Sequence, residues 1–190
     1  SSGMREVMLN FGVDVPIDVV PNGVDLNPFK KPIKPISRSE LGFDEDNVVL
    51  VYVGRLGPEK NLNFLLRSFS GVVSVYKNSR LVIIGDGPER ENLEELASKS
   101  KFSDTIRFIQ AVPYEKVPAY LAAADAFVTA SVTEVHPLTV IEAMAAGLPI
   151  LGICSPGISD TIEDEVTGLL SADEDLASFT AKMGFLVRES

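Results

Sequence analysis

Short apolar runs that alternate with helix-like segments constrain the fold of this chain more than any other feature. Residues 48–53 (VVLVYV) form a continuous apolar run, typical of a central strand buried on both faces of a parallel sheet. Residues 62–76 then carry apolar side chains at helical spacing. Further strands are expected at 81–85, 105–109, 126–130, 149–154 and 168–170, and further helices at 88–99 and 117–124. Strands that alternate with helices predict an α/β, doubly wound, Rossmann-like parallel sheet of about six strands.

The stretch 126–149 carries the signs of a strand, a polar turn and a helix. Pro137 suits the first helical position, because its missing N–H would have no partner there. Gly147 stands where the end of a helix is expected, and Pro149 behind it prevents continuation. The strand therefore leads through a short turn into the N-terminus of a helix.

Such a helix N-terminus offers a binding site for a ligand that has an anionic centre and hydroxyl groups at both ends. The backbone N–H groups of Leu138, Thr139 and Val140 are expected to be free and to point toward the turn. Glu134 in the turn and Glu142 in the second helical turn lie on either side of them. If all the steps between these two residues were helical, the carboxylates would be about 12 Å apart along the axis, roughly the length of a sugar–phosphate–ribose unit. The pattern predicts a nucleotide-sugar as ligand.

A basic turn is expected to face this acidic one. In the strand order 3-2-1-4-5-6, the turns after strands one and four meet at the point where ligands bind. The turn after strand one contains Gly54, Arg55, Gly57 and Lys60, so glycines can allow close backbone approach and the two cations can hold phosphate. The turn 85–88 is expected to border the same crevice. No strand is followed by a G-x-G-x-x-G or Walker sequence, so a dinucleotide or P-loop site is not indicated.

Charge and cysteine content narrow the classes of function. The formal net charge of −10 lacks the excess of positive charge that is typical of nucleic-acid-binding proteins, and it argues against a polybasic membrane patch. The single cysteine, Cys154, rules out an internal disulfide and favours a cytoplasmic setting, and it is expected to pack as a small hydrophobe on the fifth strand. There is no apolar run of about 18 residues or more that could span a bilayer.

Three outlying segments carry weaker signals. A short amphipathic helix is expected over residues 4–11, a connector over 27–37 and a loop near the crevice over 155–160.

Four motifs in a fixed order, spread over residues 15–170, point to a known family. They are Pro21-Asn22-Gly23-Val24-Asp25, Val53-Gly54-Arg55-Leu56 with Lys60, Gly85-Asp86-Gly87-Pro88, and Glu134-x7-Glu142 followed by residues 143–149. This set resembles the C-terminal half of a family 4 retaining glycosyltransferase of GT-B fold. The resemblance implies that residues 26–190 are the donor-binding domain, ending before a terminal crossover helix. It also implies that residues 1–25 are the tail of a connection from an N-terminal, acceptor-binding domain.

The resemblance also implies roles for the charged residues. Arg55 and Lys60 would hold the pyrophosphate and stabilise the departing charge. Glu134 would accept hydrogen bonds from the transferred hexose and Glu142 from the ribose. The family retains anomeric configuration without an established enzyme nucleophile and without a bound metal.

The rest of the donor site follows by the same likeness. The amides of Leu138 and Thr139, with Gly54, would complete the phosphate cradle, and the backbone around Phe108, Ile109 and Gln110 would meet the base. A UDP-sugar is the expected donor, although GDP and ADP stay open.

His136 and Pro137 depart from the family pattern. A proline removes one amide from the cradle, and His136 either reaches the hexose or a phosphate, or simply caps and packs. The stretch 134–139 resembles enzymes that glucosylate diacylglycerol, so the acceptor is expected to be a lipid or a sugar, with membrane association through the missing domain. Two alternatives stay open: a GT-B epimerase or phosphorylase, and a non-catalytic interaction domain.

Overall fold

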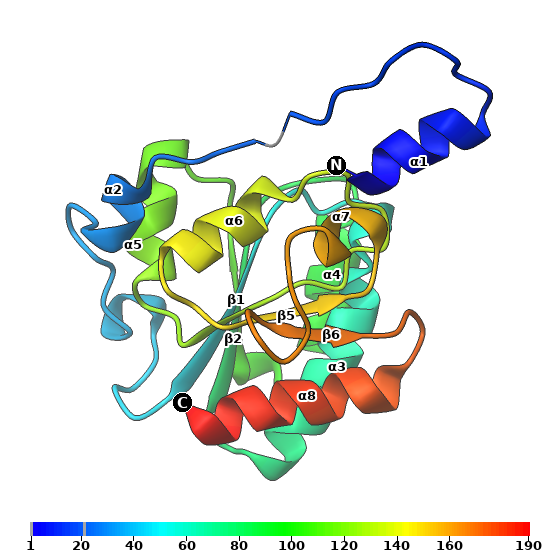
Figure 1. The fold of residues 1–190 in the computed structure, drawn as a ribbon. Coiled ribbons are helices and arrows are strands. Elements are labelled where there is room, and N and C mark those ends of the chain that lie inside the picture. The colour runs from blue at the N-terminus through cyan, green and yellow to red at the C-terminus, as the bar shows by residue number, and fades with distance from the viewer. Residues whose placement is uncertain (1, 21) are drawn as a thin grey trace.

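The six strands form one parallel sheet in the order β3-β2-β1-β4-β5-β6, as the sequence predicts (Figure 1). The computed structural model describes residues 2–20 and 22–190. The strands are β1 (Val48–Val53), β2 (Ser79–Ile84), β3 (Ile106–Ile109), β4 (Ala126–Val128), β5 (Ile150–Ile153) and β6 (Leu169–Ser171). The doubly wound α/β fold class is therefore confirmed.

Helices cover both faces of the sheet (Figure 1). One face packs against α3 (Leu62–Val75), α4 (Arg90–Ser98) and α8 (Leu176–Glu189). The other packs against α2 (Leu26–Lys30), α5 (Val117–Leu121), α6 (Leu138–Ala145) and α7 (Pro156–Ser159). Short 3-10 turns are η1 (Ser39–Leu41), η2 (Pro58–Lys60), η3 (Ser103–Thr105) and η4 (Tyr114–Lys116).

The continuous apolar run of β1 is explained by these two layers. Leu50 and Tyr52 belong to the core beneath α3 and α8, whereas Val49 and Val51 belong to the core beneath α5 and α6. Successive residues of a strand point to opposite faces, so a strand covered on both sides needs apolar residues at every position.

Three helical segments were missed from the sequence. Asp25 caps α2 by accepting the Asn27 N–H at 3.0 Å, within the passage expected to be a connector. The expected loop 155–160 contains α7. The helix α8 packs on α3 through an edge-to-face contact of Phe64 and Phe179, with ring centroids 5.3 Å apart.

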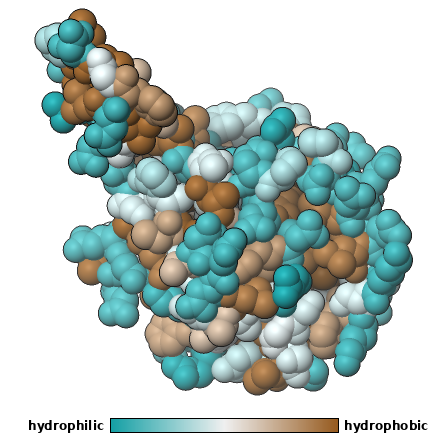
Figure 2. All heavy atoms as spheres, turned by 90° about the vertical axis from the view of Figure 1, so that its right-hand side faces the viewer, coloured by the Kyte–Doolittle hydropathy of each residue, from teal (hydrophilic) through white to brown (hydrophobic). Residues whose placement is uncertain are grey.

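The N-terminal helix and the cysteine lie apart from the core. Helix α1 (Ser2–Asn10) has no buried residue and projects from the body beside α7 (Figures 1 and 2). Cys154 follows β5 and is exposed, so the prediction that it packs as a hydrophobe was wrong. Its thiol instead lies 3.2 Å from the Ser159 hydroxyl.

Within residues 2–20 and 22–190, none of the helices combines the length and apolar character needed to cross a bilayer.

Candidate functional site

The basic and acidic turns meet at the C-terminal ends of β1 and β4, which are neighbours in the sheet. The ammonium of Lys60 lies 2.6 Å from a carboxylate oxygen of Glu134, and these side chains are only 19% and 18% exposed. The Glu59 carbonyl also accepts the Val132 N–H at 3.3 Å. The two turns therefore lie against each other, as the strand order predicts.

Arg55 stands outside this contact. Its side chain is 63% exposed, and its guanidinium pairs with Glu59 at 3.0 Å. The backbone N–H of Glu59 and this guanidinium hold the pKa of the Glu59 carboxyl below its ordinary value. Because the pair is open to solvent, a phosphate could compete with Glu59 for Arg55 at little cost.

The turn after β2 is hydrogen-bonded to the turn after β1. The Leu56 N–H donates to the Asp86 carbonyl at 2.9 Å, and the Leu56 carbonyl accepts the Glu89 N–H at 3.0 Å. A Cβ on Gly85 would lie 1.8 Å from the carbonyl oxygen of Gly54, so glycine is required there. The two turns form one unit.

Gly54 has a neighbour that the sequence analysis missed. A Cβ at this position would lie 2.7 Å from the Tyr52 hydroxyl, which donates to the Arg55 carbonyl at 3.0 Å. Burial raises the pKa of Tyr52, so the neutral hydroxyl remains a donor. Gly54 thus allows the buried tyrosine to fix the shape of the basic turn.

The N-terminus of α6 has fewer free amides than expected. Pro137 caps the helix instead of occupying its first position, and its carbonyl accepts the N–H of Val140 at 3.0 Å and of Ile141 at 3.2 Å. The prediction of a free amide at Val140 was therefore wrong. Within residues 2–20 and 22–190, the N–H groups of Leu138 and Thr139 donate to no protein acceptor.

The other end of α6 agrees with the prediction. Gly147 has φ +81° and donates to Met144, and the Leu148 N–H donates to Ala143 at 3.0 Å. This pair of bonds satisfies carbonyls that a helix C-terminus leaves open.

Glu142 is 4% exposed and has no cationic partner in the part of the chain that the structure describes. Burial raises the pKa of its carboxyl, and a hydrogen bond from the Tyr114 hydroxyl partly offsets this. Burial and the Glu142 charge in turn raise the pKa of Tyr114. Tyr114 was missed from the sequence, because a tyrosine in a turn 28 residues away gives no local signal.

His136 contacts the segment that precedes α2. Its Nε2 accepts the Asn22 N–H at 3.3 Å, and its Nδ1 is buried with no partner among residues 2–20 and 22–190. Since Nε2 accepts, the ring proton lies on Nδ1. A buried donor without a partner costs roughly 1–3 kcal/mol, which favours a ligand oxygen at this position. Pro21 of the same motif lies outside the described residues.

The three residues expected to contact the base lie at the end of β3, and they differ in how many of their groups already have a partner in the protein. The side chain of Phe108 packs against the core, and the Ile109 carbonyl already accepts from Gly85 at 3.0 Å and from Arg90 at 3.3 Å. Gln110 is exposed and makes no hydrogen bond to another described residue. Of the three, Gln110 is the best placed to bind a base.

Metal ligation has no obvious place here. Among the described residues, no group of three or more His, Cys, Asp or Glu side chains could hold a metal ion.

Sequence comparison identifies relatives of this chain. The profile of the family described as "Glycosyl transferases group 1" matches residues 33–190. An alpha-monoglucosyldiacylglycerol synthase of Streptococcus pneumoniae is 31% identical over 181 residues, or 92% of this chain and 41% of that protein. A D-inositol 3-phosphate glycosyltransferase of Frankia alni is 32% identical over 182 residues, or 91% of this chain and 45% of that protein. The chain thus spans less than half the length of these relatives.

Solved structures share the fold. The pneumococcal O-GlcNAc transferase GtfA, in complex with UDP and GlcNAc, has a TM-score of 0.74 at 22% identity, covering 100% of this chain and 37% of that one. HepE of Anabaena, in complex with UDP-glucose, has a TM-score of 0.75 at 22% identity, covering 88% of this chain and 46% of that one. At this identity the likeness establishes the fold alone.

Proposed function

The chain belongs to the group 1 glycosyltransferase family, and we propose that it forms the donor-binding half of a retaining hexosyltransferase that uses a UDP-sugar. Residues 26–190 would be the nucleotide-sugar domain, and residues 1–25 the connection from an acceptor-binding domain. UDP and UDP-glucose in the related structures support this choice of donor.

One observation carries the proposal: the contact of Lys60 with Glu134 beside the free amides of Leu138 and Thr139. The strand order brings the end of β1, which leads to Lys60, next to the end of β4, which leads to Leu138 and Thr139. Ligands bind at this point of the sheet in this class of fold. A diphosphate is an anion of the right size and charge for such a cradle.

Donor binding would rearrange the ion pair. A phosphate oxygen that takes over the Lys60 ammonium leaves Glu134 free to accept hydrogen bonds from hexose hydroxyls. Arg55 would likewise exchange Glu59 for phosphate, and its exposed position allows the swing. The pair would thus hold both side chains in place until the donor arrives.

The remaining residues would orient the donor. Glu142 would exchange the Tyr114 hydroxyl for ribose hydroxyls, and the backbone at Gln110 would meet the base. The Nδ1–H of His136 would donate to a donor phosphate or the hexose.

We propose front-side displacement for the transfer step. The bond between the anomeric carbon and the donor phosphate breaks, and the acceptor oxygen bonds to the same face of that carbon. The departing phosphate takes the acceptor proton, while Lys60 and Arg55 stabilise its negative charge. The step needs no metal ion and no enzyme nucleophile.

Transfer also needs the acceptor to be held against the donor, so this chain alone should bind UDP and catalyse little. By its name, the first relative given above makes a glucosylated diacylglycerol, which supports a lipid acceptor and an enzyme that works at a membrane surface. Product analysis of the full-length enzyme separates transfer from epimerisation or phosphorolysis by the same donor site.

Titration of the labelled chain with UDP, followed by NMR, tests the donor site. We expect shifts at the amides of Lys60, Leu138 and Glu142 and none at Lys99, which is paired with Glu95 at the end of α4. Lys60→Met should abolish these shifts, and Lys99→Met should preserve them. Saturating UDP that leaves the first three amides unmoved would reject the site.

A further inference from the structure

A cavity of about 850 Å³ lies between α2, the segment after it, η4 and α5. We call it the lysine groove. Its lining residues are Asn27, Pro28, Lys30, Lys31, Ile33, Lys34, Ile36, Tyr114, Glu115, Lys116, Pro118, Ala119 and Tyr120. Tyr114, which contacts Glu142, is shared with the candidate donor site, and none of the other lining residues is assigned to that site. The rest of the groove therefore needs its own explanation.

Its charge is opposite to that of the chain. Four of the 17 basic residues, Lys30, Lys31, Lys34 and Lys116, line this one cavity of a chain with net charge −10. Within residues 2–20 and 22–190, none of these ammonium groups has a carboxylate partner within 4.0 Å. Glu115 is the acidic residue of the lining. The net charge of the whole chain therefore does not describe this one cavity.

The interior of the groove is apolar, and contacts between its elements hold its walls in place. Its walls come from two prolines, two isoleucines, an alanine and two tyrosine rings. The Ile36 N–H donates to the Ala119 carbonyl at 3.0 Å, which ties the segment after α2 to α5. Phe29 packs edge-to-face on Tyr114, with centroids 6.4 Å apart. Ile33 is 90% exposed at the rim, an apolar side chain offered to solvent.

We propose that the lysine groove docks an anionic phospholipid of a membrane surface. The phosphate would lie among the lysine ammonium groups, an acyl segment along the apolar walls, and Ile33 in the interfacial region of the bilayer. The lysines would attract an anionic leaflet by charge complementarity. The apolar interior would accept an acyl chain, and neither a free phosphate nor an acidic peptide carries one. This proposal does not rest on the donor site.

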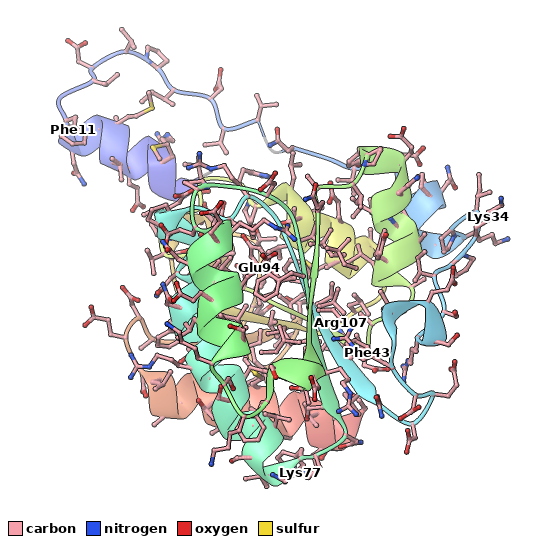
Figure 3. The ribbon with its side chains drawn as sticks, turned by 180° about the vertical axis from the view of Figure 1, so that it is seen from behind. Phe11, Lys34, Phe43, Lys77, Glu94 and Arg107 are labelled. Carbon is pink, nitrogen blue, oxygen red and sulfur yellow. The ribbon has the colours of Figure 1, made fainter. Side chains whose placement is uncertain are left out.

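Vesicle binding of this chain tests the proposal. We expect co-sedimentation with vesicles of phosphatidylcholine and phosphatidylglycerol (70:30) but not with phosphatidylcholine alone. The double variant Lys30→Gln, Lys34→Gln should lower the affinity roughly 25-fold, since each lysine near an anionic leaflet contributes about a factor of five. Lys77→Gln with Lys101→Gln is the matched control: both lysines lie over the Phe102 ring, and Figure 3 shows Lys77 far from Lys34. An equal loss in both pairs, or equal binding to neutral vesicles, would overturn the proposal.

A second measurement uses the unmodified chain and separates lipid from free anion. Dihexanoylphosphatidylglycerol below its micelle concentration should shift the NMR signals of Ile33, Ala119 and Tyr120, and inorganic phosphate should not. The same shifts with inorganic phosphate, or displacement of the lipid by UDP, would refute lipid docking at a separate site. The NMR shifts that UDP causes at Lys60 are measured separately. A negative result for lipid binding therefore does not bear on the proposed donor site.

Discussion

Replacing Lys60 by methionine should destabilise the chain by about 1–3 kcal/mol. The change leaves the Glu134 carboxylate, 18% exposed, without the ammonium that now lies 2.6 Å away. Removing one partner of a fully buried pair costs about 3–5 kcal/mol, and the residual exposure lets water recover part of this. The methionine side chain keeps the apolar packing of the lysine methylene groups, so the loss of stability measures the effect of removing the ammonium charge.

The assay is urea unfolding of four chains in a double-mutant cycle: wild type, Lys60→Met, Glu134→Gln and the double variant. The double variant should be more stable than Lys60→Met, because it removes the unpaired carboxylate. Lys99→Met provides the control, since the Lys99–Glu95 pair is 70% and 63% exposed and should contribute at most about 0.5 kcal/mol. Equal losses for Lys60→Met and Lys99→Met, with additive changes in the cycle, would refute the reasoning.

Three further predictions concern the same site. Burial raises the pKa of Glu142, so the ionised form is disfavoured in the fold and stability falls as pH rises above the ordinary value of 4.5. Glu142→Gln should therefore raise Tm at pH 7.5 but not at pH 4, while weakening UDP binding in calorimetry; a loss of Tm at pH 7.5 would contradict this. Gly85→Ala places a Cβ 1.8 Å from a backbone oxygen and should lower the free energy of unfolding by about 3 kcal/mol or more in urea unfolding. Gly147→Ala meets open space at φ +81°, so it should lower the free energy of unfolding by only about 1 kcal/mol. Arg55→Ala, at an exposed side chain, should leave Tm unchanged but lower turnover of the full-length enzyme at least tenfold; unchanged turnover would exclude its role.

The layered fold could be predicted because its cause is local. A strand covered on both faces must be apolar along its covered length, and β1 and residues 81–84 of β2 are apolar in the sequence. The short helix α2 could not be found by the same means, because five residues give no period, and the burial of Phe29 and the Asp25 cap stabilise it. The helix α8 did carry a signal: Phe179, Met183, Leu186 and Val187 follow helical spacing and are buried.

The site was predictable where it follows from strand order and not where it depends on packing. Adjacent strand ends bring Lys60 to Glu134, so topology alone placed that pair. The contact of Tyr114 with Glu142 joins the 3-10 turn η4 to helix α6, which share no sequence pattern. The cap position of Pro137 depends on backbone angles. Of the groove lysines, Lys30, Lys31 and Lys34 already lie together in the sequence, and only Lys116 joins them through folding.

The hydrogen bonds of Leu56 to Asp86 and Glu89 limit how the sequence of this domain can vary. Two turns joined by backbone hydrogen bonds cannot gain or lose a residue independently, since an insertion in either would displace the backbone that carries Arg55 and Lys60. Diversification of this domain should therefore spare the lengths of both glycine segments and accumulate beyond β3, where Gln110 stands without backbone partners.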